Sequence, residues 1–326
     1  MLLNKTVNQI FILALLVAPT VVSASDIYPS KPLRVIVTFA AGGGTDLIAR
    51  LLSPKMSAQL GQPVVVENRP GAAGQLGAEF AVSAPADGYT VLLASSSTAT
   101  LPYLRKTKYD LLEDFVPVGQ VGVGGFVLVT NPKLPFKTLG EFMSAAKANP
   151  GKYTYGSIGQ GSLGHIGLAL LKAKSGVDMV HVPYKSSTEV AYAIISGQID
   201  SAIDTLPVHK PFIDAQSANA LATTGPIRDV SLPQVPTFNE SKLIPGGFEL
   251  TFWYGFFVPR ATPTPVVERV QAAFAAVMKD PEVIQRLKDF GVAPSQITAA
   301  EFHSNIASEV GGWRKVIKDN KIMMND

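Results

Sequence analysis

A glycine-rich segment, Gly159-Gln-Gly-Ser-Leu-Gly164, follows a predicted strand and precedes a predicted helix. Its spacing, G-x-G-x-x-G, lets a backbone turn hold the pyrophosphate of a dinucleotide. The surrounding sequence argues against that chemistry. The next predicted strand ends in Val182-Pro-Tyr-Lys185, where a ribose-binding Asp or Glu is expected, and the motif lies mid-chain rather than in the first strand–helix unit. We therefore predict that the protein uses no cofactor.

The other reactive residue types also lack the spacing that catalysis needs. The chain has no cysteine, which excludes thiolate nucleophiles, disulfides and cysteine zinc sites. It contains no G-x-S-x-G elbow, no H-E-x-x-H and no Walker loop. The histidines show no metal-ligand spacing and are expected to be structural: His165, His181, His209 and His303. The sequence predicts neither an enzyme nor a metal site.

Loops of small or hydroxyl-bearing residues follow four predicted strands, and most lead into a helix. A helix N-terminus has unpaired amides and a positive dipole end, so each loop is a possible anion site. Each also has a structural explanation, because glycines serve turns and hydroxyls cap helices. The carboxyl ends of parallel strands gather on one side of a sheet, which favours a shared crevice. Neutral amide and hydroxyl donors of this kind suit reversible capture of a carboxylate. The four loops are Ala41–Asp46, Ser95–Thr98, Ser157–Ser162 and Tyr184–Ser187.

Charged residues near these loops have two possible roles each. Asp204 ends a predicted strand, so its carboxylate is either an acceptor for a ligand hydroxyl, amine or water, or a cap for the turn Thr205-Leu-Pro207. Asp46 is expected to fix the first glycine loop at a helix start. Lys185 either attracts an anion or is an exposed lysine at a helix start.

The sequence around these loops alternates between short apolar runs, typical of strands, and stretches with helical spacing. From Lys31 onward, short apolar runs alternate with stretches of helical spacing, which predicts strand–helix units around mainly parallel sheets and an α/β fold. The predicted strands are Leu33–Phe39, Pro63–Asn68, Tyr89–Ala94, Tyr153–Ile158, Asp178–Pro183, Ile199–Asp204, Ala220–Thr224 and Leu250–Val258.

Helix starts are indicated most sharply in the second half of the chain. Three capping boxes, in which a hydroxyl and a carboxylate satisfy free amides, begin at Thr138, Ser186 and Thr298. The stretch Pro226–Pro245 has little periodicity and is expected to be a long connection. From Pro263 the chain is expected to be mainly helical.

Composition excludes several classes of protein. The chain has 326 residues, 47% of them hydrophobic, which is a globular composition at a length that indicates two core units. The net charge of +3 is too balanced for the basic stripe that binds a phosphate backbone, so we predict no nucleic-acid partner.

The N-terminus resembles a secretory signal. A positive start up to Lys5 precedes an apolar run, Ile10–Val22, and the small-residue pattern Val22-Ser-Ala24. We expect cleavage after Ala24, giving a signal peptide at 1–24 and a mature protein in the periplasm. The apolar run is shorter than the roughly 20 residues of a membrane span.

Motifs spread over the whole mature chain resemble one family, the Bug-type solute receptors of tripartite tricarboxylate transporters. They are Tyr28-Pro-Ser-Lys-Pro32, Thr45-Asp46, Ala49-Arg50, Val66-Glu-Asn-Arg-Pro-Gly-Ala72, Pro85-Ala-Asp-Gly-Tyr-Thr90, Val182-Pro-Tyr-Lys185, Leu232-Pro-Gln-Val-Pro-Thr237 and Asp280-Pro-Glu-Val283. Ala41 stands where many relatives have proline, and Ser186 where they have glycine, so the resemblance does not carry over the pocket volume or the ligand class.

The resemblance implies a two-lobed periplasmic binding protein fold of the type II-like class, with two strand crossovers as its hinge. It implies lobe 1 at 25–128 plus 250–326 and lobe 2 at 129–249. It also implies that no reaction is catalysed and that a small carboxylate binds between the lobes. The binding positions it implies are Phe39, Ala41, Gly42, Gly43, Gly44, Thr45, Ser95, Ser96, Ser157, Gly159, Gly161, Ser162, Tyr184, Lys185, Ser186 and Asp204.

The expected function is therefore that of an extracytoplasmic receptor, acting as a monomer, that hands its ligand to the membrane subunits of such a transporter. Two alternatives remain open from the sequence: a periplasmic enzyme acting on a carboxylate, and a sensor that docks on a signalling partner. The aromatics Phe39, Tyr184, Trp253 and Tyr254 are candidates for the far wall of the pocket, although aromatic residues are more often core.

Overall fold

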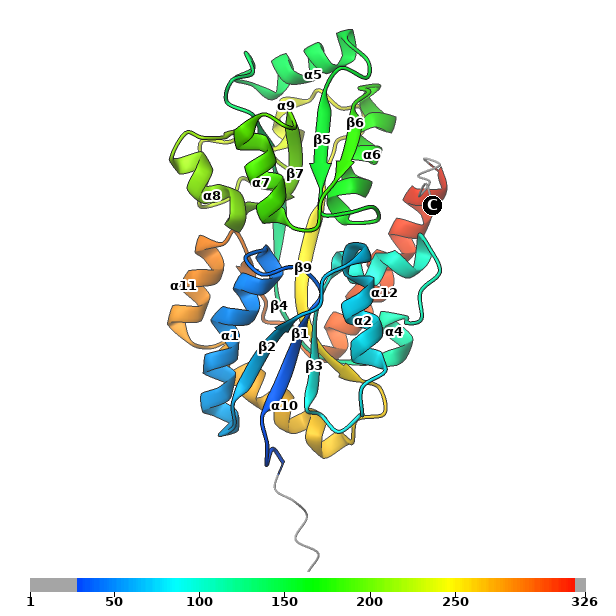
Figure 1. Ribbon diagram of the computed structural model, residues 1–326, viewed down its shortest axis with the longest axis vertical. Helices are drawn as coiled ribbons and strands as arrows, with labels where there is room; N and C mark the ends of the chain where they lie inside the picture. The colour runs from blue at the N-terminus through cyan, green and yellow to red at the C-terminus, as the bar shows by residue number, and fades with distance from the viewer. Residues whose placement is uncertain (1–27, 320–326) are drawn as a thin grey trace, which may run out of the picture.

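The structure, a computed structural model, describes residues 28–319. The predicted signal peptide and its cleavage site after Ala24 lie outside the described residues. The chain forms two lobes stacked along the long axis of the molecule, and each lobe has a sheet flanked by helices (Figure 1). The predicted α/β class and the two-lobed architecture are confirmed.

The first lobe has a sheet in the order β2-β1-β3-β9-β4. β1 pairs in parallel with β2 and β3, whereas β9 runs antiparallel to both β3 and β4. Helices cover β1 on both sides, so most of its side chains are buried, as expected for a central parallel strand. The strands are β1 (Leu33–Val37), β2 (Val64–Asn68), β3 (Thr90–Ser95), β4 (Phe115–Thr130), β9 (Thr251–Pro259) and the short β10 (Ala293–Pro294), which pairs with β4.

Helices from both ends of the chain surround this sheet. The first helix, α1 (Gly44–Leu60), packs against α10. The last helix, α12 (Ala299–Asp319), packs against β4 and α3. The helical segments of the lobe are α1 (Gly44–Leu60), η1 (Ala72–Gly74), α2 (Gln75–Val82), α3 (Ser96–Thr100), η2 (Leu101–Tyr103), α4 (Leu111–Asp114), α10 (Thr264–Val277), α11 (Pro281–Asp289) and α12 (Ala299–Asp319).

The second lobe has its own sheet, in which β5 pairs in parallel with β6 and β7. The last residues of β4 complete it, between β7 and β8. Its strands are β5 (Thr154–Ser157), β6 (Val180–Pro183), β7 (Ser201–Thr205) and β8 (Asn219–Thr223), and its helices are α5 (Leu139–Ala148), α6 (Leu163–Ser175), α7 (Ser187–Ser196), α8 (Leu206–Asp214) and α9 (Phe238–Ser241).

β4 joins the two sheets. Its residues up to Gly125 pair with β9 in the first lobe, and Phe126–Thr130 pair with β7 and β8 in the second. A strand of this length was not predicted from the sequence, because its many glycines and Pro117 interrupt the apolar pattern. The chain crosses between the lobes a second time just before β9, so two adjacent segments form the hinge (Figure 1).

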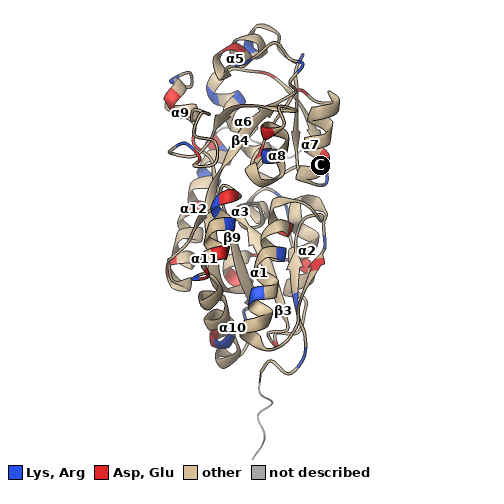
Figure 2. Ribbon diagram, turned by 90° about the vertical axis from the view of Figure 1, so that its left-hand side faces the viewer, with Lys and Arg blue, Asp and Glu red and all other residues tan. Residues whose placement is uncertain are grey.

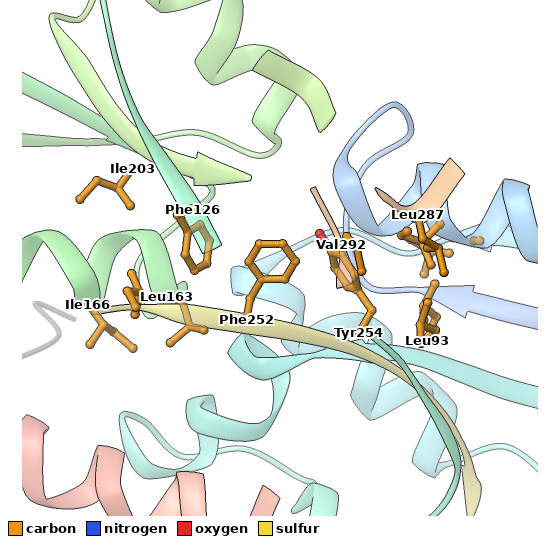
Figure 3. Packing of buried hydrophobic residues seen from close by; sticks show 14 of the residues in the cluster. Leu93, Phe126, Leu163, Ile166, Ile203, Phe252, Tyr254, Leu287 and Val292 are labelled. Carbon is orange, nitrogen blue, oxygen red and sulfur yellow. The ribbon is translucent and has the colours of Figure 1, made fainter. Parts of the chain in front are cut away.

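Thr224 fastens the two crossing segments together. Its backbone N–H donates to Phe126 O over 2.9 Å, and its Oγ1 accepts from Phe126 N over 2.8 Å. The same Oγ1 donates to Leu250 O over 2.5 Å, and Leu250 N donates to Thr224 O over 3.0 Å. The rings of Phe126 and Phe252 meet edge to face where the strands cross, with centroids 5.0 Å apart (Figure 3).

The predicted helix starts are confirmed. α5, α7 and α12 begin directly after Thr138, Ser186 and Thr298. In α5 and α12 the hydroxyl and carboxylate satisfy each other's backbone amides, whereas Glu189 accepts from Lys185 N rather than from Ser186 N. The predicted long connection is mostly irregular but contains α9, whose capping box the sequence analysis missed.

In the view of Figure 2, the positions of Lys and Arg and those of Asp and Glu are interspersed along the ribbon of both lobes. Among residues 28–319, no helix is both long enough and apolar enough to cross a membrane.

Candidate ligand-binding site

A small cavity lies where the two lobes meet the hinge. The centre of a water-sized sphere can occupy about 30 Å³ of it, which is room for more than one water molecule. The first lobe, the second lobe and both crossing strands contribute to it. It is lined by Phe39, Gly43, Gly44, Thr45, Ser95, Ser97, Phe126, Ile158, Ser187, Thr205, Phe252 and Tyr254.

Helix N-termini of both lobes converge on this cavity. Gly43 and Ser95 are the N-cap residues of α1 and α3, Thr205 is the N-cap of α8, and Ser187 is the first residue of α7. Free amides and helix dipoles at these ends favour negative charge. None of the described lining residues carries a formal charge. The cavity therefore suits an anion held by neutral hydrogen-bond donors.

Asp46 holds the first glycine loop, Ala41–Thr45, in place by hydrogen bonds. Its Oδ2 accepts from Gly42 N over 2.9 Å and from Arg50 Nε over 2.8 Å, while Oδ1 accepts from Asn68 Nδ2 over 2.9 Å. Burial alone would raise the pKa of Asp46, but these hydrogen bonds outweigh it and lower the pKa below its usual value. The carboxylate stays ionised and holds the loop, as the sequence indicated.

The N-terminus of α1 needs glycine because two hydroxyls approach it closely. A Cβ on Gly44 would lie 2.6 Å from Tyr254 Oη and 3.0 Å from Thr205 Oγ1. Burial and the nearby Asp204 carboxylate raise the pKa of Tyr254, so the phenol keeps its proton and can donate a hydrogen bond. Thr205 Oγ1 is buried without a protein hydrogen-bond partner of regular geometry, and it faces the same space.

Asp204 lies behind the cavity rather than in its lining. Its Oδ1 accepts from Ser187 Oγ over 2.9 Å and from Thr205 N over 2.7 Å. Its Oδ2 lies 3.1 Å from His209 Nε2, and both side chains are almost fully buried. In this arrangement the carboxylate positions two residues that do line the cavity, Ser187 and Thr205.

Five residues of the predicted binding set line the cavity, namely Phe39, Gly43, Gly44, Thr45 and Ser95, and so does Tyr254, which was considered for the far wall. At the other strand ends, the lining residue is the next one along the chain. Ser97, Ile158, Ser187 and Thr205 take the places expected for Ser96, Ser157, Ser186 and Asp204. Successive residues of an extended segment point to opposite sides, and a capping hydroxyl turns back onto its own helix. A one-residue error therefore exchanges a lining side chain for a supporting one.

The supporting residues have partners within the protein. Ser96 Oγ accepts from Trp253 N over 2.9 Å, and Ser157 Oγ lies 2.7 Å from His181 Nε2. Ser186 and Ser162 cap α7 and α6. The structure places the rest of the predicted set outside the cavity lining, at loop surfaces, in turns or against the second-lobe core: Ala41, Gly42, Gly159, Gly161, Tyr184 and Lys185.

The hinge contributes aromatic walls. Phe126 and Phe252 line the cavity where the strands cross, with Tyr254 further along β9 (Figure 3). Phe126 and Phe252 were not assigned to the site from the sequence. The usable signal was the aromatic run in β9, which the sequence analysis considered only for Trp253 and Tyr254. Trp253 itself points into the first-lobe core, against Phe302.

Two histidines stack in the second lobe away from the cavity lining. The rings of His165 and His181 have centroids 4.4 Å apart, and Tyr155 stacks on the other side of His181 at 4.8 Å. Burial lowers the pKa of both histidines, that of His181 to about 4. Within the described residues, no group of three or more His, Asp or Glu side chains is placed to hold a metal ion.

Comparison with known proteins identifies the family. The family described as tripartite tricarboxylate transporter family receptor (TctC) matches residues 48–322. The chain belongs to this receptor family. BugT from Bordetella pertussis strain Tohama I is 32% identical over 299 residues, which cover 91% of each chain. The resemblance to Bug-type receptors found in the sequence is confirmed.

Solved structures agree with this family membership. A structure described as a periplasmic transporter has a TM-score of 0.88 and 41% identity, covering 91% of this chain and 100% of the other. An R. palustris protein solved with adipate has a TM-score of 0.86 and 30% identity, with 90% and 98% covered. MatC from Rhodopseudomonas palustris with bound malate has a TM-score of 0.84 and 30% identity, with 89% and 100% covered.

The protein is therefore a solute-binding receptor of the TctC family with a periplasmic binding protein fold. The family model describes a transporter receptor, and two of the compared structures were solved with adipate or malate.

Proposed function

We propose that this receptor captures a small carboxylate between its lobes and delivers it to the membrane subunits of a tripartite tricarboxylate-type transporter. The observation that carries the proposal is the convergence of helix N-termini from both lobes on one uncharged, hydroxyl-lined cavity. A ligand carboxylate supplies the negative charge that such a site favours. The adipate and malate bound by the two related structures support the same ligand class.

We assign ligand contacts to residues of both lobes. The N-terminus of α1, with Gly43, Gly44 and Thr45, holds one carboxylate together with Ser95. Ser187 and Thr205 hold the opposite end of the ligand from the second lobe. Phe39 and Tyr254 are assigned to the wall of the cavity, and the residues of the predicted set outside the lining, Asp204 among them, to holding these loops in place.

Capture proceeds by opening and closing about the hinge. The two lobes contact each other beside the cavity through Arg105 and Ser97, so we expect them to separate before a ligand enters. A ligand that contacts both lobes favours the closed form by its differential affinity for that form. We keep the proposed boundaries: lobe 1 at 25–128 plus 250–326 and lobe 2 at 129–249. We also propose a periplasmic monomer released by cleavage near Ala24.

Thermal unfolding against a panel of acids tests the ligand class. The mature chain is mixed with malate, succinate, adipate and citrate, and with the fully methylated ester of each acid as its matched control. A native-state ligand at about 100 times its Kd stabilises by about 2.7 kcal/mol, so the midpoint should rise with an acid and not with its ester. Equal responses to acid and ester would contradict carboxylate capture. NMR of the recovered ligand distinguishes binding from turnover.

A second experiment tests delivery. The receptor, with a photo-crosslinker at an exposed position of each lobe, is mixed with membranes that contain the membrane subunits of a tripartite tricarboxylate-type transporter. The proposal expects crosslinks that increase when the stabilising acid is added. Equal crosslinking with and without the acid would contradict delivery by a closed receptor, while leaving ligand capture intact.

A further inference from the structure

Two hydrogen bonds connect the lobes beside the cavity, and both end on the backbone of one loop. Arg105 Nη2 in the first lobe donates to Gln160 O over 2.7 Å. Ser97 Oγ, also in the first lobe, accepts from Leu163 N over 3.1 Å. The loop Gly159–Ser162 leads from β5 into α6, whose first residue is Leu163, in the second lobe. It contains most of the G-x-G-x-x-G motif, Gly159–Gly164.

The glycines of this motif shape the loop rather than bind a phosphate. Gly159 and Gly161 have φ of 114° and 86°, a region that side chains rarely adopt. A Cβ on Gly164 would lie 2.6 Å from Ile203 O, so this glycine lets α6 pack closely on β7. Ser162 adds rigidity, because its Oγ donates to Gly159 O over 2.8 Å.

The loop faces the other lobe rather than the cavity. Only Ile158, which precedes it, is among the cavity-lining residues. A Cβ on Gly159 would lie 3.6 Å from Ala73 N in the first lobe, an ordinary contact distance. The loop therefore packs against protein, on the side of the cleft where Ser97 and Arg105 lie.

The bonded groups on the loop have no partner within their own secondary structure. Leu163 is the first residue of α6, so its amide cannot find an acceptor in the helix. Gln160 lies in the turn before that helix, where its carbonyl is outside any strand ladder. Both groups are satisfied by the first lobe only while the lobes are closed, because lobe separation breaks both bonds.

We propose that Arg105 is a closing residue that lengthens the residence time of the ligand without touching it. The inference rests on the proposed function, in which the lobes open and close around a ligand. A bond made only in the closed form shifts the equilibrium toward that form, and ligand release must break it. Arg105 does not line the cavity, so its effect is on closure rather than on ligand contacts.

The chain offers a matched control. Arg105 binds the backbone carbonyl of Gln160, so Gln160→Ala changes the same contact region and leaves the acceptor intact. Arg105→Met removes the donor and keeps most of the apolar stem. Arg105→Lys keeps a cation that can still donate, so it should behave between Met and the unmodified chain.

Stopped-flow binding of malate to the mature chain measures the effect on rates. We expect Arg105→Met to raise the dissociation rate constant about fivefold or more and to change the association rate constant less than about twofold. Gln160→Ala should change neither constant by more than about twofold. Equal effects of the two substitutions, or no effect of Arg105→Met, would overturn the proposal. The thermal midpoint of each variant checks that it is folded.

A distance measurement decides the same point without a ligand. The chain has no cysteine, so spin labels at Ala58→Cys and Gln198→Cys, exposed sites on the two lobes, report only their separation. Arg105→Met should move the distribution toward longer distances, and Gln160→Ala should not. Identical distributions would overturn the proposal. If no acid binds even the unmodified chain, the proposed function fails, whereas this measurement still decides the role of Arg105.

Discussion

The indole N–H of Trp253 donates to Glu309 Oε2 over 2.6 Å, and that of Trp313 donates to the other oxygen of the same carboxylate over 3.4 Å. These are the two tryptophans of the chain. Trp253 lies on β9 between two residues that line the cavity, Phe252 and Tyr254, and its backbone N–H is bound by Ser96. Glu309 therefore connects the C-terminal helix to the hinge strand and, through Trp253, to the start of α3.

Glu309→Ala tests this connection. Removing the carboxylate leaves the buried indole N–H of Trp253 without an acceptor, which should cost about 1–3 kcal/mol of unfolding free energy. Burial raises the pKa of Glu309, so its ionised form is costly despite the hydrogen bonds. Glu309→Gln, which keeps an acceptor and carries no charge, should lose less than half as much. Urea unfolding followed by tryptophan fluorescence measures both, and equal losses would contradict a specific role for the acceptor.

Gly44→Ala should weaken ligand binding. Its Cβ would be too close to Tyr254 Oη, at 2.6 Å, and tight against Thr205 Oγ1, at 3.0 Å. We expect at least a tenfold rise in the Kd of the stabilising acid, with a loss of stability of about 1–3 kcal/mol from overpacking. Adding Tyr254→Phe removes the nearest atom and should recover part of the stability. Isothermal titration measures affinity, with Gly311→Ala, where a Cβ meets nothing within 4 Å, as the matched control.

Asp204→Ala separates two roles of this carboxylate. As a positioning group it satisfies Ser187, Thr205 N and His209, so its removal should lower the unfolding free energy by about 2–4 kcal/mol and also weaken binding of every ligand. Titrations with malate and with succinate, which lacks the hydroxyl, give the second readout. A selective loss for malate at unchanged stability would instead favour direct contact with the ligand, the role first considered from the sequence.

The sequence predicted the elements better than the directions of their side chains. The strand–helix pattern around Leu33–Val37 and the capping boxes at Thr138 and Thr298 are local signals, because each depends on residues a few positions apart. Whether Ser96 or Ser97 faces the cavity depends on the exact residue at which α3 begins. Successive residues of a helix point about 100° apart, and periodicity does not fix a helix start that closely.

The two crossovers were expected, but the aromatic contacts at the hinge were harder to predict because they exist only through pairing between distant segments. Phe126 and Phe252 are separated widely in sequence and meet only because β4 changes its partner from β9 to β7 and β8. No local pattern marks that change. The same holds for Arg105 and Gln160, whose contact requires both lobes to be in place.

The stacked histidines predict how stability depends on pH. Burial, with smaller effects of His165 and Lys172, lowers the pKa of His181 from 6.5 to about 4, so the folded chain keeps this ring neutral. The unfolded chain protonates the ring near pH 6.5, so stability should be fully present above that pH and should fall as the pH drops toward 4. The shift corresponds to at most about 3 kcal/mol, and partial exposure of the ring lowers the expected loss to about 2 kcal/mol.

His181→Phe keeps the stack on Tyr155 and removes this titration, so its urea midpoint should decline less between pH 7 and pH 4.5. His303→Gln, on α12 away from the stack, is the control. A decline in His181→Phe as steep as that of the unmodified chain would contradict the assignment.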